Sequence, residues 1–324
     1  MIEAHGLSKR YGAKIAVDDV SFTVQPGKVT GFLGPNGAGK STTMRMIVGL
    51  DRPTGGAVTV NGKPYKQHKA PLHEVGALLD AKAVHTKRSA YNHLRALAAT
   101  HGISNKRVNE VIELTGLGPV AKRRVGGFSL GMGQRLGIAV ALLGDPQTLI
   151  FDEPVNGLDP EGVLWVRNLA KGLASEGRTV FLSSHLMSEM AVTADHLIVI
   201  GRGRIIADAP ISEIIAGQDK IRTLVRTDQP EELRRALENR ETSFTQLEPD
   251  LLEITGREPR SIAEAALARQ ILIYELTPRQ SSLEEAYMEL TRDQVEYQSQ
   301  AIEQPQAPAP AAEATLTSGG GKSA

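Results

Sequence analysis

Gly34-Pro35-Asn36-Gly37-Ala38-Gly39-Lys40-Ser41 decides the fold, because it fits the pattern G-x-x-x-x-G-K-[ST] of a phosphate-binding P-loop. The glycines let backbone N–H groups turn toward a polyphosphate, and a helix that follows points its positive end at the same anion. Lys40 supplies a charge for the outer phosphates, and the hydroxyl of Ser41 suits Mg²⁺. Residues 34–42, which end at Thr42, are therefore the predicted phosphate site.

The flanks of this loop agree with a strand–loop–helix unit. Residues 29–33, Val-Thr-Gly-Phe-Leu, predict a short buried strand, and residues 41–50 predict a helix that ends before Pro53. A glycine-rich loop can arise by chance, but a strand before it and a helix after it are the context that a P-loop requires.

The composition narrows the classes of partner. The 324 residues include 37 Lys and Arg and 37 Asp and Glu, so the net charge is zero, which argues against a nucleic acid as the main partner. There is no cysteine, and hence no disulfide or thiolate metal site. No apolar run approaches the ~18 residues that span a bilayer, and the N-terminus does not resemble a secretory signal. If the protein serves a membrane process, we expect another chain to supply the spans.

The order of elements predicts two folded parts and a tail. Residues 1–217 alternate strand-like and helix-like segments, as in an α/β sheet, and no internal repeat indicates a second such unit. Residues 218–295 predict a small ferredoxin-like α+β domain of order βαββαβ. Its segments are 221–227, 231–238, 244–247, 251–254, 262–269 and 271–276. A last helix over 283–290 carries a capping box, and residues 296–324, rich in Pro, Ala and Gly, are expected to be disordered.

Two acids follow another apolar strand. Leu149-Ile150-Phe151 precedes Asp152 and Glu153, which places both carboxylates at the carboxyl edge of the sheet, where open α/β sheets bind ligands. Asp152 can hold the Mg²⁺ shell, and Glu153 can orient and polarise a water for attack on the γ-phosphate. Adjacent acids in a loop are often only solvated charge, but after an apolar strand in a P-loop protein the functional interpretation is favoured.

Residues 128–135, Phe-Ser-Leu-Gly-Met-Gly-Gln-Arg, carry a resemblance to a family. The segment resembles the signature motif of the ABC (ATP-binding cassette) ATPases, whose usual core is Leu-Ser-Gly-Gly-Gln. Ser129 and Gly131 match that core, whereas Leu130 and Met132 depart from its first Gly and its Gln. A serine hydroxyl and exposed N–H groups at a helix start can still contact a γ-phosphate. The variant Ser-Leu-Gly-Met is similar to that of drug-export ATPases in the ABC-2 branch.

Other family positions appear in the expected order. Asp159, in Asn156-Gly157-Leu158-Asp159, resembles the acid of the D-loop. His185 resembles the switch histidine that contacts the γ-phosphate, and Tyr11 resembles the aromatic residue that stacks on adenine. A lone histidine is often a surface or capping residue, and a tyrosine of the first sheet can be a buried core residue. Both structural interpretations remain open at the level of sequence.

One position departs clearly from the family. Asp80 ends the segment Val-Gly-Ala-Leu-Leu-Asp, residues 75–80, which aligns with the Q-loop, where the family usually has Gln. A carboxylate is a hard oxygen ligand and can approach Mg²⁺ or the attacking water. It also adds negative charge beside a polyphosphate. Similar acids in some antibiotic-export ATPases make Asp80 a mark of a subfamily.

The resemblance implies a P-loop ABC cassette with a helical subdomain over about residues 81–128. In that family two cassettes face head to tail, so the resemblance implies a homodimer in which ATP lies between one P-loop and the opposite subunit's signature and D-loop. The implied contacts from the opposite subunit are Ser129, Leu130, Gly131, Met132 and Asp159. Catalysis is expected from Glu153 and His185, and Mg²⁺ binding from Ser41, Asp80 and Asp152.

The expected function is the ATP-hydrolysing subunit of an ABC exporter, at the cytoplasmic face of the membrane and paired with an ABC-2 type integral membrane permease. The permease is expected to dock on the helical subdomain, where Tyr91, Leu94 and Leu97 either line a groove or belong to the core. The alternative is a soluble ABC ATPase that remodels a non-membrane partner. The transported substrate is not encoded in this chain.

Overall fold

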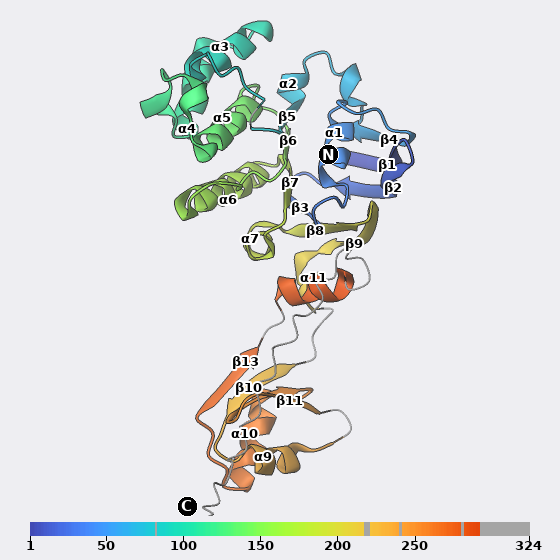
Figure 1. The fold of residues 1–324 in the computed structure, drawn as a ribbon, viewed down its shortest axis with the longest axis vertical. Helices are drawn as coiled ribbons and strands as arrows, with labels where there is room; N and C mark the ends of the chain where they lie inside the picture. The colour runs from blue at the N-terminus through green and yellow to red at the C-terminus, as the bar shows by residue number, and fades with distance from the viewer. Residues whose placement is uncertain (82, 217–220, 240–241, 280–281, 292–324) are drawn as a thin grey trace, which may run out of the picture.

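The computed structural model describes residues 1–81, 83–216, 221–239, 242–279 and 282–291 of the chain (Figure 1). Helices α3 (Ala90–Thr100) and α4 (Asn105–Leu114) lie near one end of the long axis, and a separate small sheet lies at the other. The predicted tail, residues 296–324, lies outside the described residues.

The main sheet has six strands in the order β5-β6-β7-β3-β8-β9. The first five strands in that order are parallel to their neighbours, and β9 pairs antiparallel with β8. Strands β3, β6 and β7 are buried at every position, which explains their continuous apolar runs. The strands are β3 (Val29–Leu33), β5 (Val75–Leu78), β6 (Thr148–Phe151), β7 (Thr179–Ser184), β8 (His196–Gly201) and β9 (Arg204–Pro210).

A second sheet packs beside the first. Its strands β1 (Ile2–Tyr11), β2 (Lys14–Val24) and β4 (Gly55–Val60) are antiparallel, in the order β2-β1-β4. Three phenylalanines join the sheets, with ring centroids 5.2 to 6.0 Å apart, and they belong to one buried apolar cluster. These are Phe22 of β2, Phe32 of β3 and Phe181 of β7.

Four longer helices accompany the main sheet: α1 (Lys40–Ile47), α5 (Leu130–Leu142), α6 (Pro160–Ser175) and α7 (Met187–Thr193). Helices α3 and α4 pack on α5, and Leu94, Val108 and Leu136 are fully buried in the same core. Tyr91 and Leu97 are half-buried against that core. Shorter helical segments are Tyr65–Gln67, α2 (Pro71–Glu74), Gly118–Val120, Val125–Gly127 and α8 (Ile211–Ala216).

The small sheet has the expected order of elements. Its antiparallel strands lie in the order β11-β12-β10-β13, and α9 and α10 cover the buried core on one face. The last strand begins at Glu275 and not at Ile271: Ile271 lies in the preceding loop, where its N–H donates to Ala266 O at 2.9 Å and its side chain is buried in that core. The elements are β10 (Arg222–Arg226), α9 (Pro230–Leu237), β11 (Ser243–Glu248), β12 (Leu251–Thr255), α10 (Pro259–Ala268) and β13 (Glu275–Arg279).

The last described helix, α11 (Leu283–Thr291), returns to the main body, as Figure 1 shows. It contacts α7, α8 and β9, and Leu283, Ala286 and Tyr287 are buried in the same apolar core as the main sheet. The predicted capping box is present, because Glu285 N–H donates to Ser282 Oγ and Ser282 N–H donates to the Glu285 carboxylate. The predicted fold class, an α/β P-loop cassette with a helical subdomain and a small α+β part, is confirmed.

Candidate nucleotide site

Four of the predicted motifs follow neighbouring strands at one edge of the main sheet. The parallel strands β3, β7, β6 and β5 are neighbours, and the segments that follow them are the P-loop, His185, the pair Asp152–Glu153 and Asp80. The carboxyl ends of parallel strands meet at the same edge of a sheet. The topology therefore gathers four motifs that are separated by up to about 150 residues of sequence.

Lys40 is held at the start of α1. Its side chain is only 6% exposed, and its Nζ donates to Gly34 O at 2.6 Å and to Pro35 O at 3.3 Å. Burial lowers the pKa of the Lys40 ammonium, and the carboxylates of Glu153 and Asp152 act in the opposite direction. Gly39 has φ of +111° and approaches the backbone of Ala16, so only glycine suits this turn.

Glu153 is the centre of the site. Its Oε1 lies 3.8 Å from Lys40 Nζ, and its Oε2 lies 2.7 Å from Nδ1 of His185. The backbone of Glu153 has φ of +50°, the left-handed region that residues with a side chain rarely adopt. Gln134 of α5 donates from Nε2 to Glu153 O at 3.0 Å, which helps to hold this conformation.

Ser183, the next-to-last residue of β7, joins both acids. Its Oγ accepts from Glu153 N–H at 2.9 Å and donates to Asp152 Oδ1 at 2.5 Å. Ser183 is fully buried, so its rotamer is fixed by packing as well as by these two bonds. One hydroxyl therefore sets the position of the Asp152 carboxylate and of the Glu153 backbone relative to β7.

A hollow beside the P-loop has the composition of a nucleotide pocket. It is lined by Tyr11, Lys14, Ala16, Pro35, Asn36, Gly37, Gly39, Lys40, Ser41, Thr42 and Glu153. Tyr11 is 47% exposed and ends β1; its hydroxyl donates to Asp51 at 2.8 Å, and Lys9 Nζ lies 4.9 Å from its ring centre. The buried-core alternative for Tyr11 is therefore wrong.

The signature and D-loop residues lie elsewhere. Ser129 accepts from Met132 N–H at 3.2 Å as the N-cap of α5, and Asp159 accepts from Gly162 N–H at 2.9 Å as the N-cap of α6. Neither residue lines the hollow beside the P-loop. Leu130 is half exposed and packs on Gly157, so the two motifs contact each other.

A second hollow lies on the other side of the acids. It is lined by Leu79, Asp80, Ala81, Leu130, Gln134, Asp152, Glu153, Asn156 and Gly157. Asp80 is thus brought near Asp152 and Glu153, whereas it does not line the hollow with Lys40. Among the described residues, no three His, Asp or Glu side chains form a group that could hold a metal by themselves.

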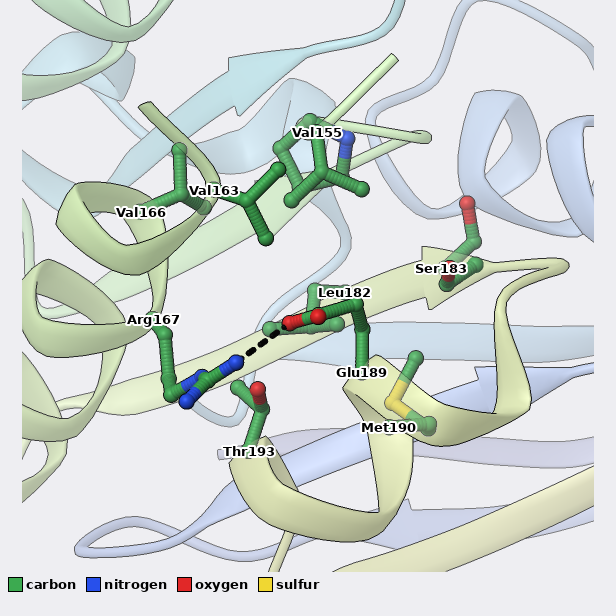
Figure 2. A pocket seen from close by; sticks show the side chains of 11 residues that line it. Val155, Val163, Val166, Arg167, Leu182, Ser183, Glu189, Met190 and Thr193 are labelled. Carbon is green, nitrogen blue, oxygen red and sulfur yellow. Dashed lines mark hydrogen bonds and ion pairs between the residues drawn. The ribbon is translucent and has the colours of Figure 1, made fainter. Parts of the chain in front are cut away.

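A small apolar hollow lies behind the Glu153 loop (Figure 2). Val155, Val166 and Met190 are among its lining residues, and Arg167 of α6 meets Glu189 of α7 across it, with Arg167 Nη2 donating to Glu189 Oε2 at 2.7 Å. This ion pair joins the helix after the D-loop to the helix after the switch histidine.

Sequence reasoning missed two supporting residues, Ser183 and Gln134. Gln134 lies within the segment 128–135 quoted above, and Ser183 lies two residues before His185. The available signal was a polar residue within an apolar element, since a buried polar side chain needs a partner. Their partners, the backbone of Glu153 and the Asp152 carboxylate, are 19 or more residues away along the sequence and become neighbours only in the folded sheet.

The fold and the site together define a P-loop nucleotide-binding cassette. A sequence profile described as "ABC transporter" matches residues 17–156, and a second, described as "Domain of unknown function (DUF8746)", matches residues 222–284. The chain is 35% identical over 295 residues to an uncharacterized ABC transporter ATP-binding protein, YhcH, of Bacillus subtilis, covering 90% of this chain and 96% of that protein.

Other relatives carry names of transport proteins. The bacitracin transport ATP-binding protein BcrA of Bacillus licheniformis is 41% identical over 217 residues, covering 66% of this chain and 71% of that protein. The Nod factor export ATP-binding protein I of Cupriavidus metallidurans is 34% identical over 302 residues, covering 90% of this chain and 97% of that protein.

Solved structures agree on the fold. The structure of an ATP-binding subunit of an ABC transporter superimposes with a TM-score of 0.62 at 27% identity, covering 67% of this chain and 92% of that one. The dimeric, post-hydrolysis structure of the cassette MJ0796 with ADP and Pi has a TM-score of 0.60 at 22% identity, covering 65% of this chain and 99% of that one. At this identity it supports the fold alone. The chain belongs to the family of ABC transporter ATP-binding proteins, and its activity is ATP hydrolysis coupled to transport.

Proposed function

We propose that Glu153 orients and polarises the water that attacks the γ-phosphate of ATP, with His185 beside it. The observation that carries this proposal is the continuous set of contacts from Lys40 through Glu153 to His185, at 3.8 and 2.7 Å. Glu153 is set by its own backbone contacts, so its carboxylate has a defined position beside the P-loop. Residues 34–42 hold the phosphates, and the half-exposed ring of Tyr11 accepts the adenine.

Mg²⁺ is the proposed partner of ATP at this site. The hydroxyl of Ser41 at the start of α1 and the carboxylate of Asp152 after β6 supply oxygen ligands, and Asp80 supplies a second carboxylate in the adjoining hollow. Mg²⁺ is usually held by one or two carboxylates together with substrate phosphates. Asp152 and Asp80 are two carboxylates, which agrees with that mode. The ion would neutralise charge on the transferred phosphoryl group.

The active form in this proposal is a homodimer. The hollow beside the P-loop is lined without any contribution from Ser129, Met132 or Asp159, while Leu130 presents a half-exposed side chain. A second copy, placed head to tail, would supply residues 129–132 and Asp159 to the ATP of the first. The site is incomplete without that copy, which makes dimerisation a part of the chemistry.

The transport direction we propose is export. The similarity to the Nod factor export protein runs over 97% of that protein, including the region that follows the cassette. In the described part of the chain, no helix is long and apolar enough to cross a bilayer. The proposed partner is therefore a separate integral membrane permease of the ABC-2 type, with this chain bound at the cytoplasmic face of the membrane.

The proposed division of the chain is a cassette over residues 1–217 and an accessory part over residues 218–295. Helix α11 belongs to that second range in sequence and to the cassette core in space. The accessory part thus reaches the cassette through α11. Its own sheet is joined to that helix by ion pairs from Arg222 and Arg279 to Glu285.

A pull-down from native membranes tests the partner. The tagged chain is solubilised in mild detergent, and a multi-spanning protein at near-equal stoichiometry is the expected companion. Recovery only in the soluble fraction, bound to a soluble assembly, would contradict the exporter proposal. The purified complex in vesicles is then assayed for ATP turnover and ATP-dependent transport.

Three variants test the site in the same complex. Lys40→Ala is expected to weaken nucleotide binding, whereas Glu153→Gln is expected to keep binding, to lower turnover by about 100-fold or more, and to trap an ATP-bound dimer on size-exclusion chromatography. If Glu153→Gln elutes as a monomer in the presence of ATP, the proposed homodimer is contradicted. Asp80→Gln separates ATP hydrolysis from the coupling of hydrolysis to transport. If transport changes while ATP turnover stays the same, Asp80 acts in the coupling.

A further inference from the structure

Charge is distributed unevenly along this neutral chain. Residues 81–129 hold nine Lys and Arg against two acids, whereas residues 221–279, the range of the small sheet and its two helices, hold eleven acids against nine Lys and Arg. The helical subdomain with α3 and α4 and the small sheet with β10 and β13 lie at opposite ends of the long axis (Figure 1). The molecule is therefore electrically polar along its length, with the helical subdomain positive.

The positive end has a defined platform made of two segments, 86–91 and 121–126. They run side by side and are joined by four backbone hydrogen bonds, and Ser89 and Arg124 form an antiparallel bridge. These bonds run from Ala90 N to Arg123 O (3.3 Å), Tyr91 N to Ala121 O (2.9 Å), Val125 N to Arg88 O (2.9 Å) and Gly126 N to Thr86 O (2.9 Å). The ladder fixes the cationic residues of both segments close to one another.

Five cationic side chains stand on this platform: Lys87, Arg88, Lys122, Arg123 and Arg124. All five residues are exposed, and within the described ranges none of them makes an ion pair with an acid. Several other cations of the molecule are paired with acids. For example, the exposed sheet face carries Arg226 between three acids. The platform therefore has a positive potential that the chain itself does not compensate.

We propose that this platform binds the anionic lipid headgroups of the membrane surface, beside the permease; the proposal rests on the proposed membrane location of the chain. A cluster of four to eight Lys and Arg is attracted to an anionic leaflet within about a Debye length. The small sheet, whose range 221–279 has a net charge of −2, would not be attracted if it faced the same surface. Both effects favour one orientation, with the helical subdomain toward the membrane.

The absence of an apolar anchor favours lipid over an acidic protein segment. Among the described residues, neither 86–91 nor 121–126 contains a large apolar side chain that is exposed. Protein interfaces generally have a desolvated apolar or aromatic centre. Long, unpaired cationic side chains on a platform suit a fluid layer of charged headgroups better than a shaped protein partner.

Vesicle flotation of the purified full chain tests the proposal. Binding is compared on phosphatidylcholine vesicles and on vesicles with about a third phosphatidylglycerol, a content chosen to give an anionic surface. We expect binding only to the anionic vesicles, and its loss at high salt. The variant with Lys87, Arg88, Arg123 and Arg124 changed to Gln is expected to bind roughly tenfold or more weakly.

A matched control carries the same change of charge elsewhere. Lys28, Lys171, Arg235 and Arg269 are exposed residues outside the platform, and the variant with these four changed to Gln is expected to bind anionic vesicles like the parent. Affinity for a labelled ATP analogue, unchanged in both variants, verifies that they are folded.

Three results would overturn the proposal: equal binding to neutral and anionic vesicles, no binding to either, or equal loss in the two variants. Association that needs the permease and is the same in neutral and anionic proteoliposomes would assign the platform to a protein segment. If ATP-dependent transport is still observed in that last case, the lipid proposal fails while the proposed exporter function holds. Failure of the lipid proposal is therefore distinguishable from failure of the proposed function.

Discussion

The guanidinium carbon of Arg135, on α5, lies 4.5 Å from the ring centre of Trp165, on α6. Arg135 also donates from Nη1 to Thr115 O at 3.1 Å, just after the end of α4. One side chain therefore joins the helix that begins at the signature serine to the helix that begins at the D-loop acid, and both to the helical subdomain. Trp165 is the single tryptophan of the chain, so this junction has its own fluorescent reporter.

Replacing Arg135 by Gln removes the cation–π contact and changes the hydrogen bond to Thr115. We expect the free energy of unfolding of the cassette to fall by about 1–2 kcal/mol, since each lost contact contributes of the order of 1 kcal/mol. Urea unfolding followed by Trp165 fluorescence measures it. Arg95→Gln on the exposed face of α3 is the control, and equal effects of the two substitutions would contradict the prediction.

Ser183→Ala removes the hydroxyl that holds Asp152 and Glu153. We expect kcat for ATP to fall by about tenfold while nucleotide affinity stays within about twofold, because supporting residues that orient ligands typically contribute 10- to 100-fold. Steady-state ATP turnover with a fluorescent-nucleotide titration gives both quantities. Ser184→Ala is the neighbouring control, since Ser184 Oγ accepts from Leu186 N–H at 2.9 Å and does not contact either acid. An unchanged kcat in Ser183→Ala would show that Ser183 is not needed to position Asp152 and Glu153 for ATP hydrolysis.

The sequence alone predicted those elements whose bounds depend on residues close to one another along the chain. The strand over 29–33 has the predicted bounds, and the helix after the P-loop begins at Lys40 and stops at Ile47, three residues short of the expected end. It stops there because Gly49 takes φ of +71°, which ends a helix. The capping box at Ser282 was also readable, because both partners lie within four residues.

The features that were not predicted depend on contacts distant in sequence. The positive φ of Glu153 is supported by Gln134 and Ser183, which are 19 and 30 residues away. Helix α11 has a normal amphipathic pattern, and nothing in that pattern says which core its apolar face enters. Ile271, the predicted start of the last strand, is instead buried in the core of the small sheet from a loop, a tertiary placement that local β propensity does not include.

The Arg167–Glu189 ion pair is expected to hold α7, and through it His185, against α6. Both side chains are about one quarter exposed, so the pair is more shielded than a surface pair. A double-mutant cycle with Arg167→Gln and Glu189→Gln should give a coupling of about 1 kcal/mol in the free energy of unfolding. The exposed pair Lys106–Glu110 is the control, for which no measurable coupling is expected. A coupling no larger than that of the control would mean that the apolar hollow alone fixes α7.

Tyr287 tests whether α11 is a structural part of the cassette. Its side chain is 8% exposed within the main core, next in sequence to Met288, which is 63% exposed on the same helix. We expect Tyr287→Ala to lower the free energy of unfolding of the cassette by about 3 kcal/mol, as for other large buried side chains, and Met288→Ala by less than about 0.5 kcal/mol. Urea unfolding followed by Trp165 fluorescence reports the cassette specifically.

The packing of α11 in the cassette core changes how a deletion of the C-terminal part must be designed. Removing residues 219–324 would also remove α11 and expose the core around Met190 and Ile214, so a loss of activity would not identify a role for the small sheet. A chain in which a flexible linker replaces residues 221–279 while 282–291 are kept separates the two contributions. We expect this chain to retain the unfolding free energy of the cassette, whereas the full deletion should lose at least as much as Tyr287→Ala. Equal stability of the full deletion and the parent would show that α11 contributes nothing to the cassette core.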